Sequence, residues 1–363
     1  MTPYFALLSV PAIVGLFNRR ATSWVALLPV LALYVFFIGY RYRVGMDWNN
    51  YDSIHTFIRY LNFREVLETT EPLSNALFWT SSHLGYHMLL TNIVHALVLS
   101  FGVFSFAKRT VNPWLAIVVA TPYLIIAFGM SGVRQAMALG VILYLFSRWE
   151  RTGVLGRVIL VGVASLFHTS AFVALAFVIP GLPVRRVYKA ILGAALAVAV
   201  SFVLFESGIY DESIGSYQAQ YLGEHESVVS PGALMHVGLV WIPAVYFLLF
   251  RNQLAPFVHN SKLALYGSLA SVVMIVVYFV STTAASRLIL YLYFVPMMVI
   301  PAASCVYGRR YRPLMTAILG ALHVVILAIW LLYANNSAAH IPYRNVAFER
   351  SSGGFLSAVY RGY

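Results

Sequence analysis

The chain has 363 residues, of which 61% are hydrophobic and only 10% are charged, and its mean hydropathy is +0.79. This composition excludes a soluble globular domain, and the single cysteine excludes both a disulfide framework and a cysteine-based metal cluster. The net charge of +12 does not indicate nucleic-acid binding, because the basic residues lie in short segments between apolar runs, as orientation signals of membrane proteins do.

Ten apolar runs have approximately the length that a helix needs to cross the hydrocarbon core of a bilayer, about 20 residues. Two further segments differ from these. Segment 72–83 is apolar but short, and we expect it to lie at the membrane interface; segment 157–184 fits either one span or two half-helices broken near Phe167, His168 and Thr169. The ten predicted spans are 3–17, 24–40, 84–106, 112–129, 131–147, 187–205, 233–250, 263–281, 288–305 and 313–334.

The distribution of charge favours a break in segment 157–184. If this segment re-enters and leaves on the side where it entered, 15 of the 24 lysines and arginines share one face with a single acid, Glu150. If it crossed once, Arg185, Arg186 and Lys189 would lie outside and every later loop would invert. The positive-inside rule then places the basic face in the cytoplasm and both chain ends outside. Non-helical backbone at membrane depth is tolerated only where it lines a cavity.

The sequence therefore predicts one all-α integral membrane domain, 1–363, with about ten transmembrane helices and a re-entrant or broken helix pair. Its longest outer segments are a first loop, 41–83, with the short interfacial helix, a second loop, 207–232, and a C-terminal tail, 335–363. No internal repeat and no appended soluble domain is apparent.

The first outer loop opens with Arg43, Gly45, Asp47 and Tyr51 directly after an apolar span. A glycine lets the backbone approach a ligand closely, and charges at this depth interact more strongly because less water screens them. A solvated pair of arginine and aspartate explains each of these residues equally well when it is taken alone. Glu71 opens the short apolar helix, where an acid ordinarily complements the helix dipole.

Arginines also stand at the outer starts of two later spans. Arg134 and Gln135 open one of them, where free backbone N–H groups and a guanidinium group can bind an anion, although Arg134 could also snorkel into water. Arg287 has a similar position, and Tyr343 and Arg344 in the tail could fold back over the same cavity. Guanidinium groups match phosphate oxygens in pairs, so several arginines around one outer cavity imply a phosphate or diphosphate ligand.

His168 lies at the predicted break, near the outer surface. A histidine there can accept a proton near neutral pH, whereas a lone histidine in an apolar run is more often a packing residue. The sequence has no DxD, Walker or glycine-rich nucleotide motif, and His83 and His87 lack the further ligands of a zinc site. We therefore expect neither a metal site nor a cofactor.

In their order along the chain, these motifs resemble the EpsG family of exopolysaccharide polymerases, a branch of the Wzy-type O-antigen and capsule polymerases. The resemblance covers most of the chain. One conservative departure is Trp48, which stands where the family more often has tyrosine. The motifs that carry the resemblance are R-x-G-x-D-x-x-x-Y from Arg43 to Tyr51, Glu71-Pro72, Val133-Arg134-Gln135, Phe167-His168-Thr169-Ser170, Arg287 before Tyr291, and Pro342-Tyr343-Arg344.

The resemblance implies a GT-C-like, metal-independent glycosyltransferase that uses lipid-linked substrates. It would transfer a growing glycan from undecaprenyl diphosphate to a hydroxyl of an incoming lipid-linked repeat unit, on the outer face of the bacterial plasma membrane. Its partners would be these two substrates, the lipid bilayer and a chain-length regulator protein, with no nucleic acid. The implied roles are a base at His168 or Asp47, diphosphate binding by Arg134, Arg287, Arg43 and Arg344, and substrate contacts from Tyr51, Glu71, Gln135 and Tyr343.

Three other classes stay open at this point. A glycosyltransferase that uses a polyprenyl-monophosphate sugar typically has an acidic pair early in the first outer loop, whereas Asp47 is followed by Trp48. A transporter or flippase of lipid-linked sugars tends to show repeat symmetry and buried charge between both faces, whereas the charges here lie at the outer face. A membrane O-acyltransferase would take its donor from the cytoplasmic face, which carries mainly anchoring basic residues.

Overall fold

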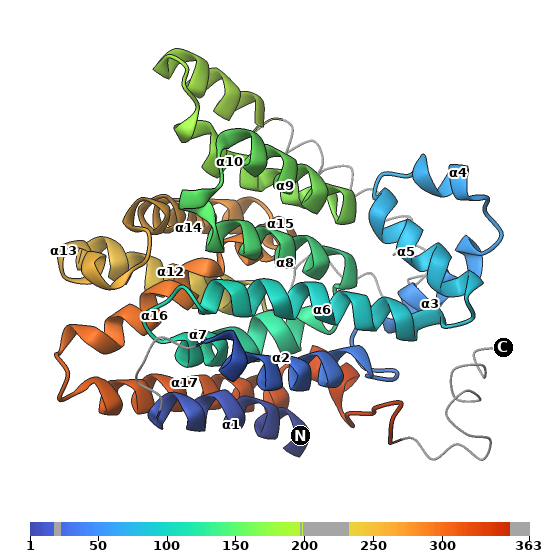
Figure 1. Ribbon diagram of the computed structural model, residues 1–363, viewed down its shortest axis with the longest axis horizontal. Helices are drawn as coiled ribbons and strands as arrows, with labels where there is room; N and C mark the ends of the chain where they lie inside the picture. The colour runs from blue at the N-terminus through green and yellow to red at the C-terminus, as the bar shows by residue number, and fades with distance from the viewer. Residues whose placement is uncertain (18–22, 197, 199–231, 349–363) are drawn as a thin grey trace.

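The computed structural model describes residues 1–17, 23–196, 198 and 232–348. The described residues form helices and contain no β-strand beyond one isolated bridge between Arg41 and Asn345. The long helices lie side by side in a bundle, and three short helices of the first loop, α3 to α5, project at one end of it (Figure 1).

The bundle consists of apolar helices, the longest of which run between its two ends. They are α1 (Thr2–Phe17), α2 (Trp24–Gly39), α6 (His87–Ala107), α7 (Pro113–Ala120) with its π-helical continuation η1 (Thr121–Gly129), α8 (Val133–Ser147), α9 (Val154–Phe167), α12 (Ala233–Leu249), α14 (Ser261–Val280), α15 (Thr282–Leu288), α16 (Phe294–Val306) and α17 (Arg312–Tyr333). The shorter elements are α3 (Trp48–Ile58), α4 (Phe63–Leu67), α5 (Pro72–His83), η2 (Trp149–Arg151), η3 (Thr169–Ala174), α10 (Leu175–Val178), η4 (Ile179–Gly181), α13 (Arg251–Leu254), η5 (Ala255–Phe257), η6 (Ile289–Leu292), η7 (Asn335–His340) and a helix at 186–196.

Three of the described helices, α6, α14 and α17, are long and apolar enough to cross a membrane, or up to five spans if each of two bent helix pairs counts as one. The pairs bend by 93° after Leu249 and by 54° after Leu292. Further apolar helices are shorter than 18 residues, so the ten predicted spans stay a prediction. Several predicted features lie outside the described residues: Arg19 and Arg20, residues 197 and 199–205 of the predicted span 187–205, nearly all of the predicted outer loop 207–232, and residues 349–363 of the tail.

The predicted break near His168 is present in the structure. Helix α9 ends at Phe167, and His168 leaves it with an extended backbone, at φ −157° and ψ 123°. The chain then turns back, so that Gly181 at the end of the returning arm lies beside the guanidinium group of Arg157, near the start of α9. Both arms of this helical hairpin therefore meet again at the end of the bundle where it began (Figure 1). Re-entry of the hairpin into a membrane stays a prediction.

Two glycines bring α6 and α8 into backbone contact. A Cβ at Gly102 would lie 2.1 Å from the carbonyl oxygen of Gly140, and a Cβ at Gly140 would lie 2.4 Å from that of Val98. Only glycine fits at such a distance, as in the small-residue contacts of membrane helices. This contact fixes α8, whose first turn carries Arg134 and Gln135.

The first loop lies against the start of α8. Gly45 has a φ of +111°, and a Cβ there would lie 2.0 Å from the carbonyl oxygen of Met130, so a glycine is required. The next residue, Met46, donates from its backbone N–H to Ser131 Oγ at 3.1 Å. These two contacts hold the first turn of α3 close to the N-terminus of α8.

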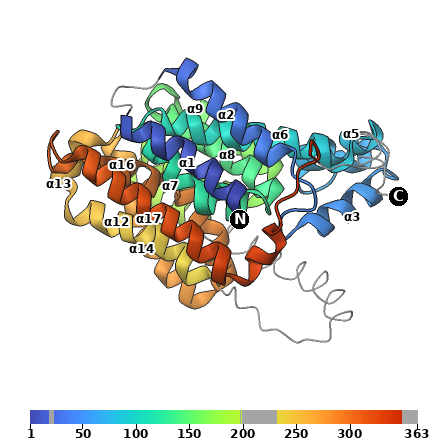
Figure 2. The same cartoon turned by 90° about the horizontal axis from the view of Figure 1, so that it is seen from below.

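The tail folds back over the first loop and the end of α2. The Tyr42 N–H donates to the Arg344 carbonyl at 3.0 Å, and the Val346 N–H donates to the Tyr40 carbonyl at 2.8 Å. Figure 2 shows this segment, in dark red, crossing from the end of α17 toward α2 and α6. The tail therefore covers the end of the bundle that also carries the first loop.

Candidate functional site

Glu71 is the centre of a polar network at this end of the bundle. It is buried at the N-terminus of α5, and its carboxylate accepts three hydrogen bonds. Arg134 Nη1 on α8 donates to Oε2 at 2.7 Å, while His168 Nδ1 donates to Oε1 at 2.5 Å and the Thr169 N–H at 3.2 Å. One carboxylate therefore joins α5, α8 and the reversal of the hairpin.

The three donors also set the charge of Glu71. Burial alone raises the pKa of this carboxyl, but the hydrogen bond and charge of His168 and the charge of Arg134 outweigh burial and lower the pKa from 4.5 to about 2. Glu71 is consequently ionised at neutral pH.

His168 is placed to act as a base. Its Nδ1 faces Glu71, its side chain is 22% exposed, and Nε2 forms no hydrogen bond with any described residue. When Nδ1 carries the proton that is donated to Glu71, the lone pair is on Nε2. The arrangement is that of a carboxylate that orients a histidine and stabilises it once it is protonated.

Arg134 has a second partner in Tyr51, which is buried on α3 and whose hydroxyl forms a hydrogen bond with the guanidinium group. Burial raises the pKa of Tyr51, with opposing contributions from the charges of Arg134 and the nearby Asp47, so the phenol is neutral. The Arg134 side chain is still 35% exposed. Part of its fork can therefore face a ligand. We call Tyr51, Glu71, Arg134 and His168 the carboxylate network.

Further hydrogen bonds tie the network to α15 and η6. Gln135 Nε2 donates to the Arg287 carbonyl at 2.9 Å, and the hydroxyls of Ser170 and Tyr291 lie 2.9 Å apart. The Tyr291 hydroxyl also forms a hydrogen bond with Gln135. Five of the motifs singled out in the sequence thus converge, although the segments that carry them are far apart along the chain.

Three predicted site residues lie apart from the carboxylate network. Arg43 is exposed, with its guanidinium 5.4 Å from the ring of Tyr42, and Arg344 is exposed beside it in the tail. Tyr343 stacks on Phe37 at 4.1 Å and donates to its carbonyl at 2.8 Å, which anchors the tail to α2. No described contact joins these three side chains to the network.

Sequence reasoning missed Arg41, which is only 2% exposed. Its Nη1 donates to the Ile38 carbonyl at 2.7 Å and its Nε to the Val44 carbonyl at 3.2 Å. The available signal was an arginine placed two residues after α2, where the apolar run has not yet reached solvent. It also missed the backbone N–H of Thr169, because no sequence pattern marks a main-chain donor.

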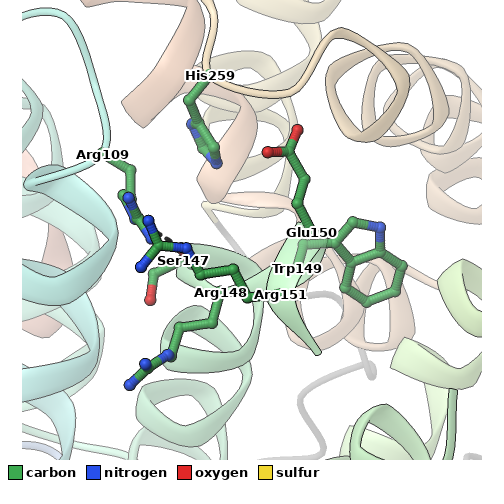
Figure 3. Close-up of a pocket in the computed structure, with 7 residues that line it drawn as sticks. All are labelled: Arg109, Ser147, Arg148, Trp149, Glu150, Arg151 and His259. Atoms are coloured by element: carbon green, nitrogen blue, oxygen red, sulfur yellow. Dashed lines mark hydrogen bonds between the residues drawn. The ribbon is translucent and has the colours of Figure 1, made fainter. Parts of the chain in front are cut away.

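A pocket at the opposite end of the bundle has different chemistry. Figure 3 shows the Glu150 carboxylate turned away from the Arg148 guanidinium, and Arg109 donates to the Ser147 carbonyl at 2.9 Å. This end carries the basic residues that the sequence assigns to the cytoplasm. The lining residues are Arg109, Ser147, Arg148, Trp149, Glu150, Arg151 and His259. Within the part of the chain that the structure describes, no three His, Cys, Asp or Glu side chains come together as metal ligands would.

Comparison with known proteins gives one result that covers the whole site. A family model described as the EpsG family matches residues 24–345, nearly the whole chain, and this range contains every residue of the carboxylate network. Searches of curated proteins and of solved structures each gave no match. EpsG is a family of Wzy-type polymerases, and its match agrees with the apolar helices in making this a membrane protein. The chain belongs to the EpsG family.

Proposed function

We propose that the protein polymerises oligosaccharide repeat units linked to undecaprenyl diphosphate, as a metal-independent glycosyltransferase on the outer face of the bacterial plasma membrane. The family supports a membrane polysaccharide polymerase that acts on lipid-linked sugars. The observation that carries the finer proposal is the pair of hydrogen bonds that Glu71 accepts, one from Arg134 and one from His168. Under this proposal, a base and a cation for the leaving group donate to the two oxygens of one carboxylate.

The proposed reaction is a displacement at the anomeric carbon of the growing glycan. His168 Nε2 removes the proton from a hydroxyl of the incoming repeat unit, and that oxygen forms a bond to the anomeric carbon. The bond between this carbon and the diphosphate oxygen breaks, and the lipid diphosphate leaves with the electron pair. The imidazolium that forms is stabilised by Glu71, and its proton passes to water after transfer.

The leaving diphosphate needs cations, because its negative charge grows as the bond breaks. Arg134 has an exposed part of its fork, and we assign this role to it together with Arg287, whose carbonyl is tied to the neighbouring Gln135. Removing one such donor typically costs about 10²–10³ in rate. Glu71 is then a positioning residue rather than the substrate contact that the sequence predicted.

We favour His168 over Asp47 as the base. Asp47 lies at the N-terminus of α3 next to Tyr51, whereas His168 has an oriented ring with an unbonded nitrogen. Asp47 then orients Tyr51 or an acceptor sugar. The orientation of the protein rests on charge, since Arg109, Arg148 and Arg151 lie at the end of the bundle opposite the carboxylate network.

The test is an assay of the purified protein in detergent with its lipid-diphosphate-linked repeat unit and EDTA, with product length read on a gel. We expect a ladder of repeat-unit multiples that is lost in His168→Gln and kept in Arg251→Gln, a change on α13 at the opposite end. Movement of the same lipid across sealed vesicles without a ladder would favour a transporter instead. A ladder that EDTA abolishes would contradict metal independence.

A further inference from the structure

Arg41 is a buried cation without a carboxylate partner. It lies just beyond α2, and no Asp or Glu oxygen among the described residues comes within ion-pair distance of it. Burial lowers its pKa from 12.5 to about 10, so it still carries its charge at neutral pH. The titratable groups near it are the phenols of Tyr4, Tyr51 and Tyr343, which are neutral, and the imidazoles of His95 and His340. A buried cation that only dipoles and carbonyls compensate is a site that an anion would stabilise.

Arg41 is one of the residues that line a pocket between the first loop, α3 and the start of α6. Arg43 also lines this pocket, and it is exposed to solvent. Neither guanidinium group is paired with Asp52, the acid on the rim of the pocket. The pocket therefore offers two positive charges, one buried and one exposed, to a ligand that enters from outside the bundle.

Three aromatic side chains, those of Tyr42, Trp48 and Tyr86, are among the residues that line the pocket. The rings of Tyr42 and Trp48 lie 5.9 Å apart in an edge-to-face arrangement, and Tyr86 is 45% exposed. Ring faces of this kind attract the weakly positive C–H faces of sugars, while carboxylates and hydroxyls bind sugar hydroxyls. Asp52 and Thr56, one turn apart on α3, supply such groups. A ligand that combines phosphate with sugar fits both sets of residues.

The pocket adjoins the carboxylate network through α3. Tyr51 is hydrogen bonded to Arg134 and also lies within the electrostatic reach of Arg41. Trp48 and Asp52 line the pocket from a neighbouring face of the same helix, because successive residues of an α-helix are about 100° apart. Two cationic sites thus flank one tyrosine.

We propose that this pocket is the acceptor site, in which Arg41 and Arg43 bind the phosphate groups of the incoming lipid-linked repeat unit and the three aromatic side chains bind its sugars. The inference rests on the proposed function. A polymerase of this kind holds two lipid diphosphates at once, separated by the sugars of one repeat unit. Since the two diphosphates repel each other, they need separate cationic sites, and Arg134 and Arg41 are the two that flank Tyr51.

The experiment counts bound undecaprenyl diphosphate by native mass spectrometry in nanodiscs of neutral phosphatidylcholine. We expect two molecules on the wild type, one on Arg43→Gln, one on Arg134→Gln and none on the double variant. Arg64→Gln is the matched control, because this outer arginine is exposed on α4 and should keep two. Arg41 is left intact, since it holds the end of α2. As a second variant, Trp48→Ala should lower the apparent affinity for a lipid-linked repeat unit at least tenfold more than for the lipid diphosphate alone.

The outcomes separate the two proposals. One molecule on the wild type, lost in Arg134→Gln and unchanged in Arg43→Gln, would overturn the acceptor site and leave the proposed function standing. Binding that neither variant changes would overturn both. Displacement of the Arg43-dependent molecule by an equal amount of phosphatidylglycerol would show a general phospholipid site, which also overturns the acceptor proposal.

Discussion

Glu71→Gln is the sharpest test of the carboxylate network, because the change keeps the shape of the side chain. All three partners of Glu71 are donors: Arg134 Nη1, His168 Nδ1 and the Thr169 N–H. Glutamine has one acceptor oxygen, so its NH₂ group must face one side of the network. If the oxygen stays with Arg134, the NH₂ faces His168 and favours the tautomer with the proton on Nε2. In that tautomer His168 cannot accept the proton of the acceptor hydroxyl.

The size of the effect follows from the same geometry. The lowering of the Glu71 pKa from 4.5 to about 2, which remains after the opposing effect of burial, corresponds to a net preference for the ionised carboxylate of roughly 3 kcal/mol. Loss of that amount in the transition state slows the reaction by about 10², and a wrong histidine tautomer raises the loss to about 10⁴. We therefore expect kcat to fall by about 10²–10⁴, with a smaller change in KM.

The assay is the initial rate of formation of the first product, two joined repeat units, by purified protein. Glu68→Gln is the matched control, since Glu68, just after α4, is 65% exposed in a surface pair with Arg64, and the change should leave the rate within about twofold of the wild type. A melting curve checks that each variant is folded. A folded Glu71→Gln variant that retains more than a third of the wild-type rate would refute the role given to Glu71.

Three further predictions concern the same region. Arg134→Ala should abolish polymer in a folded protein, and Arg134→Lys should restore little, because a lysine lacks the planar fork that can bind Glu71 and a diphosphate at once. The control Arg251→Ala should have nearly normal activity. A full ladder from Arg134→Ala would remove this arginine from the mechanism. Gly45→Ala should lower the melting temperature and the rate together, because its Cβ would lie 2.0 Å from the Met130 carbonyl; unchanged melting would show that the loop shifts freely. Because the pKa of Glu71 is lowered in the folded state, its contribution to stability is complete above about pH 4.5 and disappears as the pH falls through about 2. In Glu71→Gln, the melting temperature should therefore fall less steeply with decreasing pH between these values than it does in the wild type.

The sequence predicted those features that depend on local pattern. Helix 72–83 is present with the predicted bounds because Pro72 fixes its first turn. The break at His168 is present because a polar His-Thr-Ser run interrupts an apolar segment. The helix Trp48–Ile58 was not predicted, since its polar residues suggest a loop and its buried face becomes apparent only when it packs against α5 and α6.

The carboxylate network depends on tertiary structure, which explains why the sequence predicted its members but not its centre. Glu71 is 63 residues from Arg134 and 97 from His168. An acid at a helix start has the same sequence signature whether it faces water or buried donors. From the sequence alone, a residue that complements the helix dipole was therefore the better interpretation of Glu71. Arg43 and Arg344 show the converse, because the family resemblance implied the same diphosphate-binding role for them as for Arg134, and both lie outside the network.

The glycine contact between α6 and α8 has a consequence for turnover. A slide of one helix past the other by one turn, about 5.4 Å, would bring a larger side chain into the space where Gly102 and Gly140 leave room only for hydrogen. The pair therefore does not slide, and in the proposed reaction Arg134, at the start of α8, stays in place when the lipid diphosphate leaves. Under the proposed function, the lengthened glycan, and not this helix pair, therefore has to move after each transfer before the next repeat unit can enter.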